Sequence, residues 1–146
     1  MEVREGRIGR IIVARFDDGE DLMTGMLNVA KEKRINSGIV LLLGALRKAE
    51  VVVGPKEPIV PPEPNWYSFS DGREIAGIGT IFPQGGEPKL HLHSTCGRGE
   101  KVVLGCIRKI SEIFLIVETV IIEILGVEAE RKIDPALGIA KLIFKD

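Results

Sequence analysis

Hydrophobic and polar positions alternate along most of the chain with the period of a β-strand. The first such segment, 7–16, is rich in β-branched residues and ends at a turn signal, Asp17-Asp18-Gly19. Further strand-like segments span 39–43, 49–53, 66–70, 74–82, 89–95, 101–110, 113–125 and 140–144. The segments 39–43 and 49–53 are either two strands or one long strand bent at a glycine.

One segment breaks this pattern and predicts a helix. From Glu20 onward the apolar residues recur at helical spacing, namely at Leu22, Met26, Val29 and Ala30. We predict that Asp18 caps the amino-terminal end of this helix, because a short acidic side chain there can accept a backbone N–H.

Two further segments shape the expected fold. The run 113–125 is apolar on both alternating faces, which predicts a central strand covered on both sides. Five prolines between positions 54 and 64 remove backbone donors, so this stretch is a long loop at a mouth, an interface or a lid. The pattern predicts an α+β fold over residues 1–146 as a single domain: a strongly twisted, mainly antiparallel sheet curling toward a barrel, with one main helix.

Composition and charge narrow the class of protein. The chain has 146 residues, 20 Lys and Arg against 21 Asp and Glu, and a net charge of -1, so no global positive field favours nucleic acid. Two cysteines are too few for a disulfide scaffold, and the first ten residues lack an apolar signal segment, which indicates the reducing cytoplasm. The run 113–125 is shorter than the roughly twenty residues of a membrane span and contains two glutamates.

The two histidines of the chain, His91 and His93, stand two residues apart in a predicted strand. Period two places both imidazoles on one face, with Cα atoms about 6.6 Å apart. A hairpin turn centred between Arg98 and Gly99 would bring Cys106 opposite His91, although a bulge would shift this register by one residue.

Two imidazoles and a thiolate suit Zn²⁺ and leave a fourth tetrahedral position open. Glu118 is a candidate for that position or for supporting a ligand, because a carboxylate in an apolar run needs a metal or a basic partner such as Arg108. Cys96 is an alternative thiolate, and Cys106 alone is also compatible with a small buried hydrophobe. The pattern identifies no catalytic residue, although Glu74 and Glu118 are available for acid–base chemistry.

An ordered series of short motifs runs through the chain. It comprises Arg15-Phe16, Gly19-Glu20-Asp21-Leu22, Ser37-Gly38, Gly44-Ala45-Leu46, Glu74-Ile75, Gly79-Thr80-Ile81, Pro88 to His93, Val103 to Cys106, and Glu118-Thr119. This series resembles the plant and prokaryote conserved (PPC) domain family over nearly the whole chain. The resemblance implies a compact α+β domain that assembles as a homotrimer. Plant members join it to an AT-hook that binds the minor groove of DNA, and the present sequence has no such motif.

The resemblance also bears on the metal site. Many prokaryotic members carry a third histidine after the glycine that corresponds to Gly105, where this chain has Cys106. The architecture is similar to that of acetolactate decarboxylase, a zinc enzyme with an HxH strand and a further histidine on the next strand. This similarity supports His91, His93 and Cys106 as one metal set and does not transfer the activity.

Three functions remain open at this point. The first is a zinc-binding, trimeric PPC-domain protein that acts as a DNA-associated or regulatory module. The second is a small metal-dependent enzyme, of lyase or hydrolase type, that uses the open position on the ion. The third is a metal or buried polar cluster that holds a subunit interface together. DNA binding by this chain is expected to be weak and salt-dependent, and its small-molecule ligand is unknown.

Overall fold

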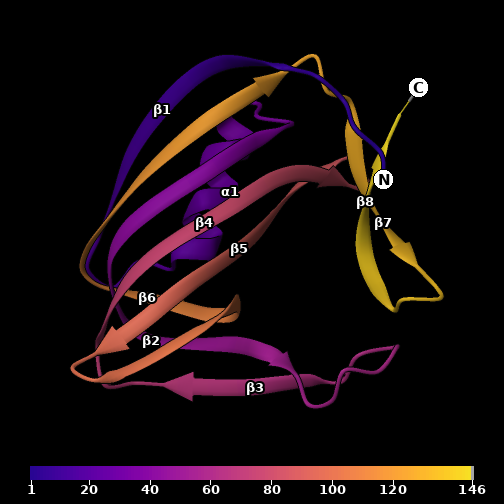
Figure 1. Cartoon of the computed structure of the whole chain (residues 1–146). Helices are drawn as coiled ribbons and strands as arrows, with labels where there is room; N and C mark the ends of the chain where they lie inside the picture. The colour runs from indigo at the N-terminus through magenta and orange to yellow at the C-terminus, as the bar shows by residue number, and fades with distance from the viewer. Residues whose placement is uncertain (146) are drawn as a thin grey trace.

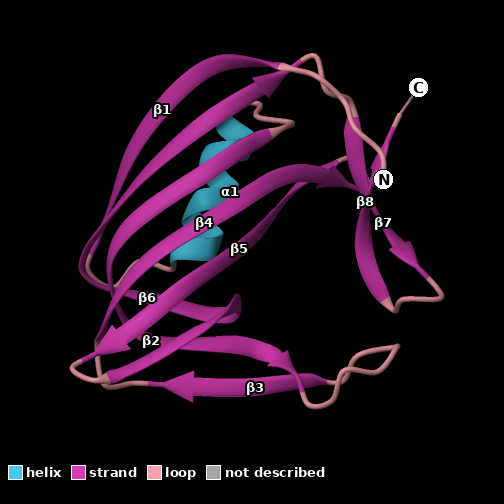
Figure 2. Ribbon diagram, viewed as in Figure 1, coloured by secondary structure: helices cyan, strands magenta, loops and turns pink. Residues whose placement is uncertain are grey.

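The computed structural model describes residues 1–145. Its main layer is a six-stranded, strongly twisted antiparallel sheet with the order β1-β6-β5-β4-β2-β3, in which β6 also pairs with β2 (Figure 1). The strands are β1 (Arg7–Asp17), β2 (Gly38–Pro55), β3 (Pro64–Phe69), β4 (Arg73–Gln84), β5 (Glu87–Arg98) and β6 (Lys101–Leu125). A helix, α1 (Leu22–Glu32), lies within the curve of the sheet (Figure 2). The α+β class is confirmed, and the sheet bends without closing into a barrel.

Two very long, bent strands shape the sheet. Segments 39–43 and 49–53 belong to the single strand β2, which bends at Gly44 with a φ of +144°. A Cβ at Gly44 would lie 2.3 Å from the Ile116 carbonyl oxygen, so only glycine fits this close approach. Segments 101–110 and 113–125 likewise merge into β6. Because β6 bends, its first part pairs with β5 and its last part with β1.

Helix α1 begins later than the sequence predicts, and the prediction that Asp18 caps it is wrong. Asp21 is the N-cap, and its Oδ1 accepts a hydrogen bond from the Thr24 backbone N–H at 2.9 Å. The other Asp21 oxygen accepts from the Ser111 hydroxyl at 3.0 Å, which ties the start of the helix to β6. Asp18 instead accepts from the Leu115 backbone N–H at 2.8 Å, because the turn after β1 extends before the helix starts.

The hydrophobic core lies between α1 and the inner face of the sheet. Its helical members are Leu22, Met26 and Ala30, and its sheet members include Val40, Leu42, Leu90, Leu92, Val117 and Ile121. These residues alternate along their strands, as expected for a sheet covered on one face.

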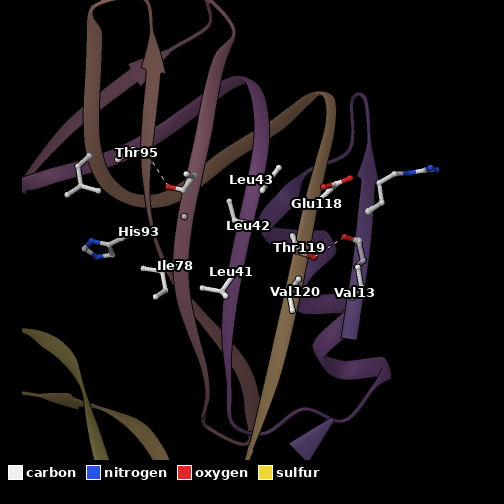
Figure 3. Close-up of a pocket in the computed structure, with 15 residues that line it drawn as sticks. Val13, Leu41, Leu42, Leu43, Ile78, His93, Thr95, Glu118, Thr119 and Val120 are labelled. Atoms are coloured by element: carbon white, nitrogen blue, oxygen red, sulfur yellow. Dashed lines mark hydrogen bonds between the residues drawn. The ribbon is translucent and has the colours of Figure 1, made fainter. Parts of the chain in front are cut away.

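The opposite face of the sheet is apolar and uncovered in the single chain. The prediction that 113–125 is covered on both sides is therefore wrong: Val117 and Ile121 are buried, whereas Ile116 between β1 and β2 is exposed. A cavity of about 730 Å³ is hollowed into this face (Figure 3). We call the exposed apolar residues that line this cavity the outer apolar face; they are Val13, Leu41, Leu43, Ile78 and Leu104.

A two-stranded hairpin follows the main sheet. It consists of β7 (Ala129–Asp134), which the sequence pattern missed, and β8 (Ile139–Phe144). The guanidinium of Arg131 links the hairpin to β4 through a 2.8 Å hydrogen bond to the Thr80 hydroxyl. Within residues 1–145, no helix is long and apolar enough to cross a membrane.

Candidate metal centre

The β5–β6 hairpin sets which residues of the candidate site meet. Its connection is the two-residue loop Gly99-Glu100, with a φ of +57° at Gly99, as in a turn with glycine at its first central position. Cys106 therefore pairs with His93, and the predicted pairing with His91 is wrong by two residues. Because a shift of two residues preserves the face, both histidines and the cysteine still project to the same side.

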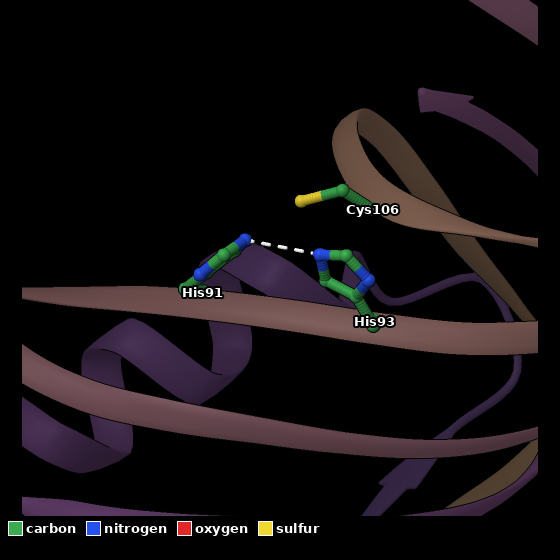
Figure 4. A group of neighbouring side chains, drawn as sticks. All are labelled: His91, His93 and Cys106. Carbon is green, nitrogen blue, oxygen red and sulfur yellow. Dashed lines mark hydrogen bonds between the residues drawn. The ribbon is translucent and has the colours of Figure 1, made fainter. Parts of the chain in front are cut away.

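The three side chains converge on one point (Figure 4). The Nε2 atoms of His91 and His93 are 3.1 Å apart, and the two rings meet edge to face with centroids 4.9 Å apart. The ligand atoms of these histidines and the Sγ of Cys106 all lie within 4.8 Å of one another. The structure thus brings together the three residues that the sequence singled out.

This arrangement fits a tetrahedral zinc ion. With zinc–nitrogen and zinc–sulfur bonds of about 2.05 and 2.3 Å, ligand atoms stand about 3.3 Å apart for two nitrogens and about 3.6 Å for nitrogen and sulfur. The observed nitrogen separation of 3.1 Å is already close to this value. The Sγ of Cys106 lies within 4.8 Å of the ligand atoms of both imidazoles and would have to move by about 1 Å to complete the set.

The local electrostatics favour a neutral imidazole and a protonated thiol before a metal binds. Desolvation lowers the pKa of His91 to about 4, and the positive charges of His93, Arg131 and Arg108 act in the same direction. Burial raises the pKa of the Cys106 thiol, while Arg108 opposes that shift. The imidazole of His91 is therefore ready to bind a cation at neutral pH, whereas Cys106 must first release a proton.

The other sequence candidates lie elsewhere. Cys96 projects from the opposite side of β5 into the core and is completely buried. Glu118 is exposed on β6 and pairs with Leu43 of β2. Three strand spacings, about 14 Å along the sheet, separate Glu118 from β5. Glu74 is also exposed, near the opposite end of β4.

The apolar run 113–125 contains a second carboxylate, Glu123, and this one is buried. Its two oxygens accept hydrogen bonds from the Arg10 guanidinium at 2.8 and 2.7 Å. These bonds lower the pKa of Glu123 to about 2. The requirement that a buried charge have a partner is thus met by an arginine on the neighbouring strand β1.

The family assignment follows from the sequence as a whole. Residues 3–125 match the profile of the Plants and Prokaryotes Conserved domain, abbreviated PCC or PPC. The chain belongs to this family. No curated protein sequence matches the chain significantly.

Solved structures share the fold of this PPC-domain chain. A metal-containing protein from Archaeoglobus fulgidus is 24% identical with a TM-score of 0.87, covering 98% of this chain and 99% of its own. A PPC protein from Pyrococcus horikoshii is 24% identical with a TM-score of 0.84, and the match covers 100% of this chain and 98% of that protein. A candidate DNA-binding protein from Bacteroides thetaiotaomicron is 21% identical with a TM-score of 0.79, and the match covers 97% of this chain and 99% of that protein. These similarities establish the fold.

A second cavity, of about 570 Å³, borders the two histidines of the PPC domain. Arg108 and Arg131 also line it, and the proline-rich loop supplies Pro55 and Pro62 to its wall. The sequence predicted this loop at a mouth, an interface or a lid, and the structure shows that it lines this cavity. Sequence reasoning missed the place of Arg131, because the charged segment 129–134 carries no apolar alternation and only the fold brings it onto β4, next to this cavity.

Proposed function

We propose that this protein binds one zinc ion per chain through His91, His93 and Cys106. The observation that carries the proposal is the convergence of their ligand atoms within 4.8 Å. The metal-containing neighbour from Archaeoglobus fulgidus has the same fold, which supports this proposal. An ion held by three protein ligands would supply Lewis acidity at its remaining position.

Metal analysis of protein purified without added zinc tests this proposal. We expect about one zinc per chain, since three ligands complete a site of the catalytic type. A chain purified with no bound metal, and taking up none when zinc is supplied, would contradict the proposal. Cys96→Ser is the matched control, because Cys96 is buried on the other side of β5.

We also propose that three chains assemble through the outer apolar face. Five large apolar side chains are exposed there around one cavity, and soluble monomers rarely expose such a patch without a partner. His93 lines both this cavity and the cavity beside the arginines. The zinc site therefore lies at the border of the proposed interface, where assembly and metal binding can influence each other.

We propose that residues 1–146 form one domain that works in the cytoplasm. Both cysteines are free and buried in the described part of the chain. A thiol that serves as a metal ligand needs a reducing compartment, because oxidation would remove it from the site.

Two roles for the metal-bound trimer remain in competition. A metal-dependent enzyme is favoured by the cavity of about 570 Å³ beside the histidines. A DNA-associated or regulatory role is supported by the fold shared with the Bacteroides protein, although the net charge of -1 provides little attraction to phosphates. Titration with duplex DNA at low and physiological salt separates them, since absence of binding at low salt would remove the DNA role.

A further inference from the structure

The cavity beside the histidines is strongly cationic. Three basic side chains line it, namely Lys89, Arg108 and Arg131. None of the described residues that line it is an aspartate or a glutamate. Its lining charge is therefore positive even before a divalent ion adds to it.

Arg131 is held in this cavity without an acidic partner. Its Nη2 donates to the Thr80 hydroxyl at 2.8 Å, and Thr80 is the cross-strand neighbour of His91. Its Nε is buried and has no hydrogen-bond partner among the described residues. The residue as a whole is half-buried, but a buried N–H group without an acceptor is costly, and a bound ligand would supply the missing acceptor.

The guanidinium of Arg108 also lacks an acidic partner among the described residues and can contact a ligand in the cavity. It follows Cys106 by two residues and is exposed at the edge of the cavity, with no ion pair in the part of the chain that the structure describes. By contrast, Arg10, Arg47 and Arg73 each pair with a carboxylate. Arg108 and Arg131, the two arginines that line this cavity, therefore have no carboxylate partner among residues 1–145.

The remaining wall of the cavity is apolar. It is formed mainly by Val52, Pro55, Pro62, Leu90 and Ile139. A volume of about 570 Å³ suits a small molecule and exceeds what an inorganic ion needs. The ligand should therefore combine an anionic head with an apolar body.

We propose that this cavity binds a small organic anion, whose carboxylate or phosphate head contacts Arg108 and Arg131 and whose body lies against the proline-lined wall. Guanidinium groups suit both heads because their N–H groups match the oxygens of either anion. The proposal deepens the zinc assignment and rests on it in part, because the head group would also face the open position on the ion.

Calorimetric titration of the purified protein tests the proposal with three probes of four carbon atoms each: butyrate, butyl phosphate and neutral butyramide. We expect one or both anions to bind at least about tenfold more tightly than butyramide, because a charged head gains charge-assisted hydrogen bonds. The preferred anion identifies the natural head group. Equal binding of butyramide, or no binding of either anion, would overturn the proposal.

Two variants and two controls locate the binding. Arg131→Met and Arg108→Met should each weaken anion binding about tenfold or more while leaving butyramide unaffected. Lys109→Met and Lys132→Met remove the same charge from neighbouring residues that do not line the cavity, and should have little effect. Because Arg108 is exposed, its variant is expected to fold even if Arg131→Met does not. Unchanged anion binding in folded Arg108→Met would overturn the proposal.

Zinc content measured on the same samples separates the two hypotheses. A zinc-free protein that still binds butyrate through the arginines would contradict the zinc assignment and support the anion site. A protein that holds one zinc per chain and binds neither anion would contradict the anion site alone.

Discussion

Replacement of Leu43 by aspartate should dissociate the proposed trimer. Leu43 is 59% exposed in the single chain, so the trimer would bury roughly 100 Å² of its apolar surface. The loss of this burial costs about 2.5 kcal/mol per subunit. The new carboxylate would also lie opposite Glu118 on β6 and would have to be desolvated at the interface, at a cost of several kcal/mol. A total of about 5 kcal/mol per subunit weakens association by about 10⁴-fold.

Sedimentation velocity over a range of concentrations measures this effect. We expect a wild-type mass of about 48 kDa, three times the chain mass of 16.0 kDa, and a shift to the single chain for Leu43→Asp. Ile133→Asp is the matched control, because Ile133 on the β7–β8 hairpin is 62% exposed but lies outside the outer apolar face. A wild type that sediments as one chain at every concentration, or a control that dissociates as readily, would refute the reasoning.

Three further predictions concern the metal ligands and the buried ion pair. In competition with a chelator, Cys106→Ser should weaken zinc binding by about 100-fold or more, Cys106→His should retain it, and Cys96→Ser should change it little; equal affinities in all three would exclude Cys106. Zinc affinity should rise about tenfold per pH unit between about pH 7 and 8.5, because the Cys106 thiol, whose pKa is raised, must lose a proton to bind the ion. His91, with a pKa of about 4, is already neutral over this range and adds no slope. A flat profile of affinity against pH would contradict this prediction. In denaturant unfolding, Glu123→Gln should lose about 1–2 kcal/mol of stability, since the partner of Arg10 loses its charge. The wild type should become less stable as pH falls from 4.5 toward 2, because the unfolded state takes up the Glu123 proton first, and this contribution should be missing in the variant.

Local sequence patterns predicted where strands and the helix lie better than they predicted which segments form one continuous strand. The alternation in β1 and β4 and the helical spacing in α1 located those elements, because each reflects which face meets the core. The pattern could not show that β2 and β6 are continuous, since a bend at Gly44 depends on the close approach of the Ile116 carbonyl. It also could not show which face of β6 lacks a cover, because both faces are equally apolar.

The alternation of side chains along a strand allowed the sequence to predict which face the candidate ligands share. The spacing of His91 and His93 placed both rings on one face, and the face of Cys106 followed from the parity of the hairpin. The register itself depends on the conformation at Gly99, which composition does not determine. Arg131 reaches the site only because the β7–β8 hairpin folds back on β4, a long-range contact without a local signal.

The absorption spectrum of the cobalt(II)-substituted protein tests the central claim most directly, because it reports the number and type of ligands at once. The account predicts the intense visible bands of a tetrahedral ion together with a thiolate-to-cobalt charge-transfer band that disappears in Cys106→Ser. A weak octahedral spectrum without a charge-transfer band in the wild type would contradict a site built from His91, His93 and Cys106.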